Sequence, residues 1–116
     1  KAVAGAAAKA EYTKADYDKQ FNTNVETQKV IDSVVGWIVA TNFKEFPDAV
    51  ALVEDATDQL KAAEDPKKKM EEAAKKEDWQ NATLWAGQWW QYQVKAADIG
   101  LRAKTYLEQK GAKKIK

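Results

Sequence analysis

The sequence predicts an all-α fold, an up-and-down four-helix bundle with one additional short charged helix. The chain has five glycines and two prolines, and no run of β-branched residues alternates with polar ones. Its apolar residues instead recur at spacings of three and four, the period of a helix with one buried face. A length of 116 residues suits a single domain over residues 1–116, with one hydrophobic core.

The N-terminal part predicts two helices with a break between them. The first covers residues 2–20, is rich in alanine, and is interrupted by the stretch FNTN. Thr23 and Glu26 have the spacing of a capping box, so a second helix is expected over residues 25–41. Apolar side chains surround most of that helix: Val30, Ile31, Val34, Val35, Trp37 and Ile38. We therefore expect it to be the most buried helix of the bundle.

The rest of the chain predicts a third helix, a short charged helix and a long last helix. Pro47 suits the first turn of the third helix, where a missing N–H costs nothing. Asp65 and Pro66 predict its end, and the charged segment KKKMEEAAKKE follows. Asp78 is the expected N-cap of the last helix, which runs to near Gly111. The basic segment GAKKIK, residues 111–116, is expected to be a frayed tail.

A seven-residue repeat predicts which side chains of the last helix face the core. Its members are separated alternately by three and four residues: Ala82, Trp85, Trp89, Tyr92, Ala96, Ile99, Ala103 and Tyr106. Such a repeat is typical of left-handed bundles with nearly antiparallel neighbours. Two of the tryptophans, Trp85 and Trp89, are therefore expected to be core residues.

Trp79 and Trp90 lie on another side of this helix, about 120 to 140° from Trp85 at about 100° per residue. Two interpretations stay open for them. Either flanking helices cover both indoles, or the indoles face a partner protein, because tryptophan is enriched at interface hot spots. Lysine runs are usually solvated, but they also steer docking onto acidic surfaces. The candidate partner-binding residues are thus Trp79, Trp90, Lys67, Lys68, Lys69, Lys113 and Lys114.

The residue types argue against catalysis and against bound metals or cofactors. The chain has neither Cys nor His, which excludes thiol chemistry, imidazole ligands and histidine bases. Glu54 and Asp58 share a helix face with Lys61, the pattern of a solvated surface. Ser33 is the only serine and has no histidine to activate it. We therefore expect a protein that is not an enzyme.

Charge and hydropathy limit the kinds of partner that the sequence predicts. Lys plus Arg number 19 and Asp plus Glu 18, and Arg102 is the only arginine, so a nucleic-acid partner is not expected. No run approaches the ~20 apolar residues of a membrane span. The start KAVAGAAAKAEY has small residues at the A-x-A spacing of a signal cleavage site. It indicates either an exported or organellar protein, or simply an alanine-rich first helix.

The stretch AAKKEDWQNATLWAGQWWQYQVKAADIGLRAKTYL resembles a segment of the extrinsic Q-type (PsbQ-like) subunits of photosystem II. Lys76, Asp78 and Trp79 match that family's K-x-D-W helix opening, and Leu84 and Tyr92 fall where it has apolar or aromatic residues. The resemblance covers about a quarter of the chain. The additional tryptophans, and the lack of a proline-rich leader, depart from the family. The resemblance implies a non-catalytic four-helix protein of the thylakoid lumen, docked on photosystem II.

Two functions follow as hypotheses. The first is a small accessory subunit that docks on a larger assembly, with the membrane-embedded photosystem II as the specific expectation. The second is a carrier of a small hydrophobic ligand or pigment, held in an aromatic slot beside Trp85, Trp89 and Tyr92. An exposed aromatic patch over a dense core would favour docking, and a well-formed pocket beside the tryptophans would favour the carrier.

Overall fold

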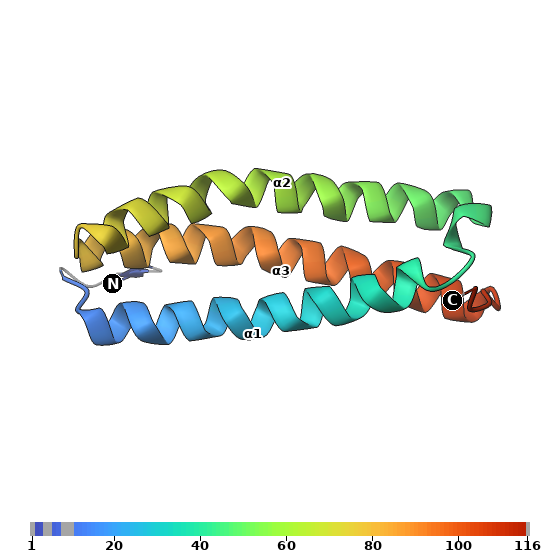
Figure 1. Cartoon of the computed structure of the whole chain (residues 1–116), viewed down its shortest axis with the longest axis horizontal. Coiled ribbons are helices and arrows are strands. Elements are labelled where there is room, and N and C mark those ends of the chain that lie inside the picture. Colours follow the sequence, from blue (N-terminus) through green and yellow to red (C-terminus); the bar gives the residue numbers. More distant parts are fainter. Residues whose placement is uncertain (1, 4–5, 8–10, 116) are drawn as a thin grey trace.

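The computed structural model describes residues 2–3, 6–7 and 11–115. Three long helices dominate this part of the chain (Figure 1): α1 (Lys14–Val39), α2 (Pro47–Lys75) and α3 (Trp79–Gln109). A 3-10 turn, η1 (Phe43–Glu45), lies between α1 and α2, and two short strands, β1 (Ala2–Val3) and β2 (Ala6–Ala7), pair antiparallel near the N-terminus. The all-α class is confirmed, but the predicted four-helix bundle is not, because the described residues form three α-helices.

The helices run up, down and up along a molecule of 50 × 25 × 19 Å. α3 packs along both α1 and α2, and it makes most of the contacts between helices. In Figure 1, α3 lies between α2 and α1 over most of its length. The most buried helix is therefore α3 rather than the one predicted around Val35. Val30 and Val35 are 46% and 41% exposed, because α1 has a packing partner on only part of its circumference.

The predicted break at FNTN does not occur, and α1 is one continuous helix. Its N-cap is Thr13, which forms a capping box with Asp16, ten residues before the expected one. Thr23 instead donates to the carbonyl of Lys19 inside the helix, at 3.2 Å. Asn24 is fully buried against α3. The polar residues that indicated a break are thus accommodated by a side-chain bond within the helix and by packing on α3.

Pro66 does not end a helix either. α2 continues to Lys75, so the predicted short charged helix is its last part. A proline inside a helix removes one backbone hydrogen bond and costs about 3 kcal/mol. Pro66 and its neighbours Ala63, Met70 and Ala73 are buried. Burial of this face offsets the cost of the proline and keeps the helix intact.

The core strip of α3 matches half of the predicted repeat. The buried positions are Ala82, Ala86, Trp89, Gln93, Ala96, Gly100, Ala103 and Leu107, together with Thr83 at one side. At every second position of the predicted repeat, the buried residue is therefore the next one along the chain, for example Ala86 instead of Trp85 and Gln93 instead of Tyr92. The reason is that two helices cover α3 from different sides, which centres its buried strip one residue further on. Trp85, Tyr92 and Tyr106 lie at the edge of this strip, where they are half-buried against the core.

α2 packs on α3 through alanines spaced seven apart, Ala49, Ala56 and Ala63, all of them buried. Ala49 belongs to one core cluster with Ala103, and Ala63 belongs to another with Ala86. Side chains this small let two helix axes approach closely. The pair α2–α3 is therefore the tightly packed part of the fold.

The C-terminal segment predicted to fray is held in place as far as Ile115. Gly111 adopts a positive φ of 74°, which turns the chain back after α3. The backbone oxygen of Lys113 then accepts the N–H of Asn42 at 2.9 Å, and the N–H of Lys113 donates to the Asn42 Oδ1 at 2.8 Å. The N–H of Ile115 donates to the carbonyl of Ala40 at 2.7 Å. These bonds tie the tail to the α1–α2 connection.

A polar network lies inside the α1–α3 interface. Asn24 and Gln93 are both 0% exposed. The Asn24 amide donates to the Gln93 side chain at 2.9 Å and to the carbonyl of Ala86 at 3.0 Å. Gln93 in turn donates to the backbone oxygen of Asn24 and to Gln28. A buried polar pair that is fully bonded fixes the register of two helices, since any shift leaves polar atoms without partners.

We expect Gln93→Leu to lower the free energy of unfolding by about 1.5 kcal/mol, because Asn24 and Gln28 lose a buried partner. The double variant Asn24→Leu/Gln93→Leu should lose less than the sum of the two single changes, since neither buried amide is then left without the other as its partner. Urea denaturation of the four proteins in this cycle measures both values. Strict additivity would show that the two side chains do not act as a pair.

Candidate functional site

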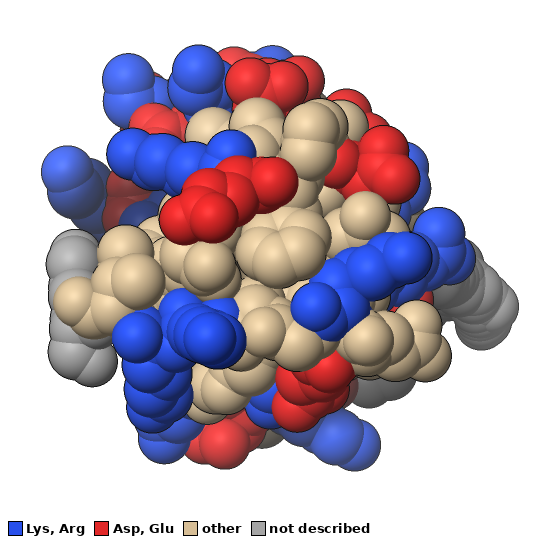
Figure 2. Space-filling view, turned by 90° about the vertical axis from the view of Figure 1, so that its right-hand side faces the viewer, with Lys and Arg blue, Asp and Glu red and all other residues tan. Residues whose placement is uncertain are grey.

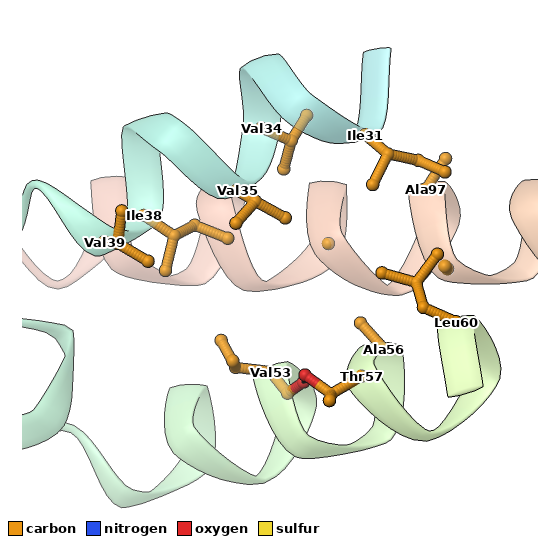
Figure 3. A pocket seen from close by; sticks show the side chains of 12 residues that line it. Ile31, Val34, Val35, Ile38, Val39, Val53, Ala56, Thr57, Leu60 and Ala97 are labelled. Atoms are coloured by element: carbon orange, nitrogen blue, oxygen red, sulfur yellow. The ribbon is translucent and has the colours of Figure 1, made fainter. Parts of the chain in front are cut away.

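A groove between α1 and α2, floored by α3, is the candidate site (Figure 3). One wall is formed by α1 and the other by α2, and in Figure 3 their side chains point toward the space between the two helices. The lining residues are Ile31, Val34, Val35, Ile38 and Val39 of α1, Val53, Ala56, Thr57 and Leu60 of α2, and Ala96, Ala97 and Gly100 of α3. Apart from Thr57, all of these residues are aliphatic or glycine.

The floor of the groove is low because its residues are small. Ala96 and Gly100 are buried in α3, and neither has a side chain that reaches far into the space above. A Cβ added at Gly100 would lie 3.1 Å from a Val34 methyl group, so α1 packs directly on this glycine. The walls are taller, since they carry valine, isoleucine and leucine. A cavity of about 110 Å³ results between them.

Aromatic side chains fill the corresponding space nearer the N-terminal end of α1. The ring centroid of Tyr17 lies 5.9 Å from that of Phe21, and Phe21 lies 6.3 Å from Trp89 of α3. Burial raises the pKa of the Tyr17 hydroxyl, and the carboxylates of Asp18 and Glu71 raise it further. Tyr17 and Phe21 also pack against the core cluster that contains Ala63 and Met70 of α2, so α1 and α2 come close here. The groove is therefore confined to the other half of the molecule.

Of the two predicted docking tryptophans, Trp79 packs within the fold. Its ring centroid lies 5.4 Å from that of Tyr17, and the ammonium of Lys14 lies 5.6 Å from the indole. Trp90 is more open, at 36% exposure, and its indole N–H donates to the Thr27 hydroxyl at 3.0 Å. Both indoles thus contact α1, and neither lines the groove.

The predicted basic residues occupy separate places. Lys67 and Lys69 lie over tryptophan rings, at 5.4 Å from Trp89 and 4.6 Å from Trp85. Lys69 also pairs with Asp65 at 3.3 Å, while Lys68 is exposed. Lys113 and Lys114 are exposed too, at the far end of the molecule beside the α1–α2 connection. Figure 2 shows that end, where basic and acidic side chains are interspersed. No single surface unites the tryptophans with both lysine runs.

The predicted aromatic slot is occupied by packing. Trp89 is 7% exposed and belongs to the core cluster of Ala63, Met70 and Ala86, while Trp85 and Tyr92 pack against that cluster. Lysine ammonium groups lie over all three rings, Lys95 being 5.5 Å from Tyr92. A cation held over an aromatic face contributes about 0.5 to 1 kcal/mol at an exposed site. Trp85 and Trp89 therefore help to hold α2 and α3 together.

The groove was missed from the sequence, although two signals for it exist. Val35 and Val39 extend the apolar side of α1 beyond the arc that one neighbour covers, and they are 41% and 42% exposed. Small residues also follow one another in α3 at Ala96, Ala97 and Gly100. The broad apolar side of α1 predicts deep burial of this helix, and that prediction would be correct only if α1 lay at the centre of the bundle.

Other kinds of site find little support in the described residues. Within them, no group of three or more acidic side chains is placed to hold a metal ion. None of the described helices has the length and apolar character needed to cross a membrane. Comparison of the chain with family models, with curated proteins and with solved structures finds no match.

Proposed function

We propose that this chain is a non-catalytic docking module, which receives an apolar helix of a partner protein in the groove between α1 and α2. The observation that supports the proposal is the groove itself, with aliphatic walls on two helices and a floor of small residues on a third. It lies where a four-helix bundle would have its remaining helix. An amphipathic helix in an apolar groove is a common mode of protein recognition.

The size of the groove suits a helical segment. Along α1 the lining runs from Ile31 to Val39, about 12 Å at about 1.5 Å per residue, or a little over two turns. Val35 and Val39 remain about two-fifths exposed there. Covering such side chains is favourable by about 25 cal/mol for each Å² of apolar surface removed from water.

A charge placed in the groove should block docking without disturbing the core. We expect Val35→Glu to weaken the binding of an amphipathic helical peptide with a leucine and alanine seam at least tenfold. A carboxylate that enters an apolar contact loses its hydration without gaining a partner. Fluorescence anisotropy of the labelled peptide measures the affinity.

The matched control is Val30→Glu, which puts the same change on the same helix at a valine that is 46% exposed and does not line the groove. This variant should bind the peptide as the wild type does. The proposal fails if the wild type binds no such peptide, or if both variants lose binding equally.

A second function, that of a carrier for a small apolar ligand, is favoured by the cavity in the groove. Its volume of about 110 Å³ is of the order of the 150 Å³ apolar cavity that holds benzene in another protein. The ligand would lie among aliphatic side chains rather than in the aromatic slot expected from the sequence. A methyl NMR titration with benzene distinguishes the two functions, because a carrier would show saturable shifts at Ile31 and Val53 while binding no peptide.

Photosystem II remains the specific assembly that we propose, on the resemblance around Lys76, Asp78 and Trp79. In the fold, Asp78 caps α3 by accepting from the N–H of Asn81 at 3.2 Å, so this motif also has a local structural role. Cosedimentation with photosystem II membranes stripped of their small extrinsic subunits tests the assignment. Binding by wild type and Val30→Glu, with loss in Val35→Glu, would support it, and no cosedimentation of the wild type would refute it.

A further inference from the structure

The groove also indicates what kind of helix it receives, an inference that depends on the docking function proposed above. We infer that the partner helix is basic at its flanks and carries one bulky apolar side chain at its centre. The first part of the inference comes from the charges along the rims of the groove, and the second from the shape of its floor.

The rims carry more acid than base. Beside the lining residues of α1 lies Asp32, exposed and fixed by a hydrogen bond from the Gln28 amide at 2.9 Å. Glu54, Lys61 and Glu64 are exposed positions of α2, next to Val53 or within one turn of Leu60. By helical periodicity all four fall on or near the outer edges of the two walls. The two rims together thus carry three carboxylates and one ammonium.

Among the residues that the structure describes, no ion pair neutralises these acids. The described ion pairs lie elsewhere: Lys14–Asp18, Lys29–Glu26, Lys69–Asp65 and Arg102–Asp98. A partner helix in the groove would hold its own flanking side chains beside the rims. Lysine or arginine at these flanking positions would meet opposite charge, whereas glutamate or aspartate would be repelled.

The floor defines the centre of the partner helix. Between the tall walls, Ala96, Ala97 and Gly100 leave the cavity of about 110 Å³. A helix that presented only alanine there would leave this space empty, and its lining would lose van der Waals contacts. A leucine or phenylalanine would insert into it as a knob enters a hole between helices. Such a central, buried anchor usually carries much of the binding energy of an interface.

Three synthetic peptides with the same apolar seam and comparable helicity test the inference. The first has a central leucine and lysine flanks, the second a central leucine and glutamate flanks, and the third a central alanine and lysine flanks. We expect the first to bind the wild-type protein about tenfold more tightly than the second at low salt, with the difference shrinking at 1 M salt. Its affinity for the wild-type protein should also be at least about tenfold higher than that of the third peptide.

The variant Asp32→Asn/Glu54→Gln/Glu64→Gln provides the control on the protein side. It should retain the preference for leucine over alanine and lose the preference for lysine over glutamate flanks. Equal affinity of the first two peptides for the wild type would overturn the charge assignment, and equal affinity of the first and third would overturn the anchor. In either case the docking function would stand. Failure of all three peptides to bind would instead refute docking itself.

Discussion

Leu107→Ala is expected to lower the free energy of unfolding by about 2 to 5 kcal/mol, because it removes a fully buried side chain from the core. Leu107 is 0% exposed and packs in a cluster with Val34, Ile38, Ala49 and Ala103. This cluster joins all three helices at one end of the molecule. The cavity left behind cannot collapse easily, since the carbonyl of Leu107 also accepts the N–H of Ala112 and so helps hold the C-terminal segment.

Urea denaturation followed by circular dichroism measures this loss, and Leu101→Ala is the matched control. Leu101 lies in the same helix and is 44% exposed, so the same truncation there should cost less than about 1 kcal/mol. Similar losses in the two variants would mean that the end of α3 is not packed as the structure describes. A loss well below 2 kcal/mol at Leu107 would mean that the site collapses around the shorter side chain.

The period of α3 could be read from the sequence, but not the centre of its buried strip. Spacings of three and four gave the helix and half of its core positions, including Ala82, Trp89 and Ala103. The other half depends on where the neighbouring helices lie. Because α3 is covered from two sides, Gln93 is fully buried while Tyr92 lies at the edge. Gln93 can be a core residue although it is polar, because Asn24 of α1 supplies its hydrogen-bond partner.

The number of helices differs from the prediction because tertiary packing keeps two helices intact at residues that often end a helix. Asn24 and Pro66 are residues that end many helices. Here one is bonded to α3 and the other is buried beside Met70, so both helices continue. Such helix boundaries depend on tertiary packing, such as the bond from Asn24 to the Ala86 carbonyl 62 positions away, which a local pattern does not contain.

The candidate site was the hardest feature to predict for the same reason. A groove is defined by side chains of several helices, and by the absence of a further helix over them in the described structure. The sequence shows that Val35, Val39 and Val53 are apolar, but not that two walls face each other. Conversely, the tryptophans drew attention because of their number, whereas the fold uses most of them for packing under lysine side chains.

The close pairing of α2 and α3 leads to the second large effect. Ala63→Leu should lower the free energy of unfolding by about 3 kcal/mol, near the upper end for overpacking, since there is no space for three additional carbon atoms beside Trp89 and Ala86. A loss of this size is a large fraction of the roughly 6 to 17 kcal/mol expected for a domain of this length. Thermal or urea unfolding of the purified variant measures it.

The adjacent residue offers a matched control. Ala62 is exposed while Ala63 is 3% exposed, and both lie in the middle of α2. Leucine and alanine have nearly the same helix propensity, so Ala62→Leu should change stability by no more than about 0.5 kcal/mol. The difference between the two variants therefore reports packing between helices alone. If both substitutions were tolerated, the alanines spaced seven apart would not mark a tight contact, and α2 would have to lie further from α3 than the structure places it.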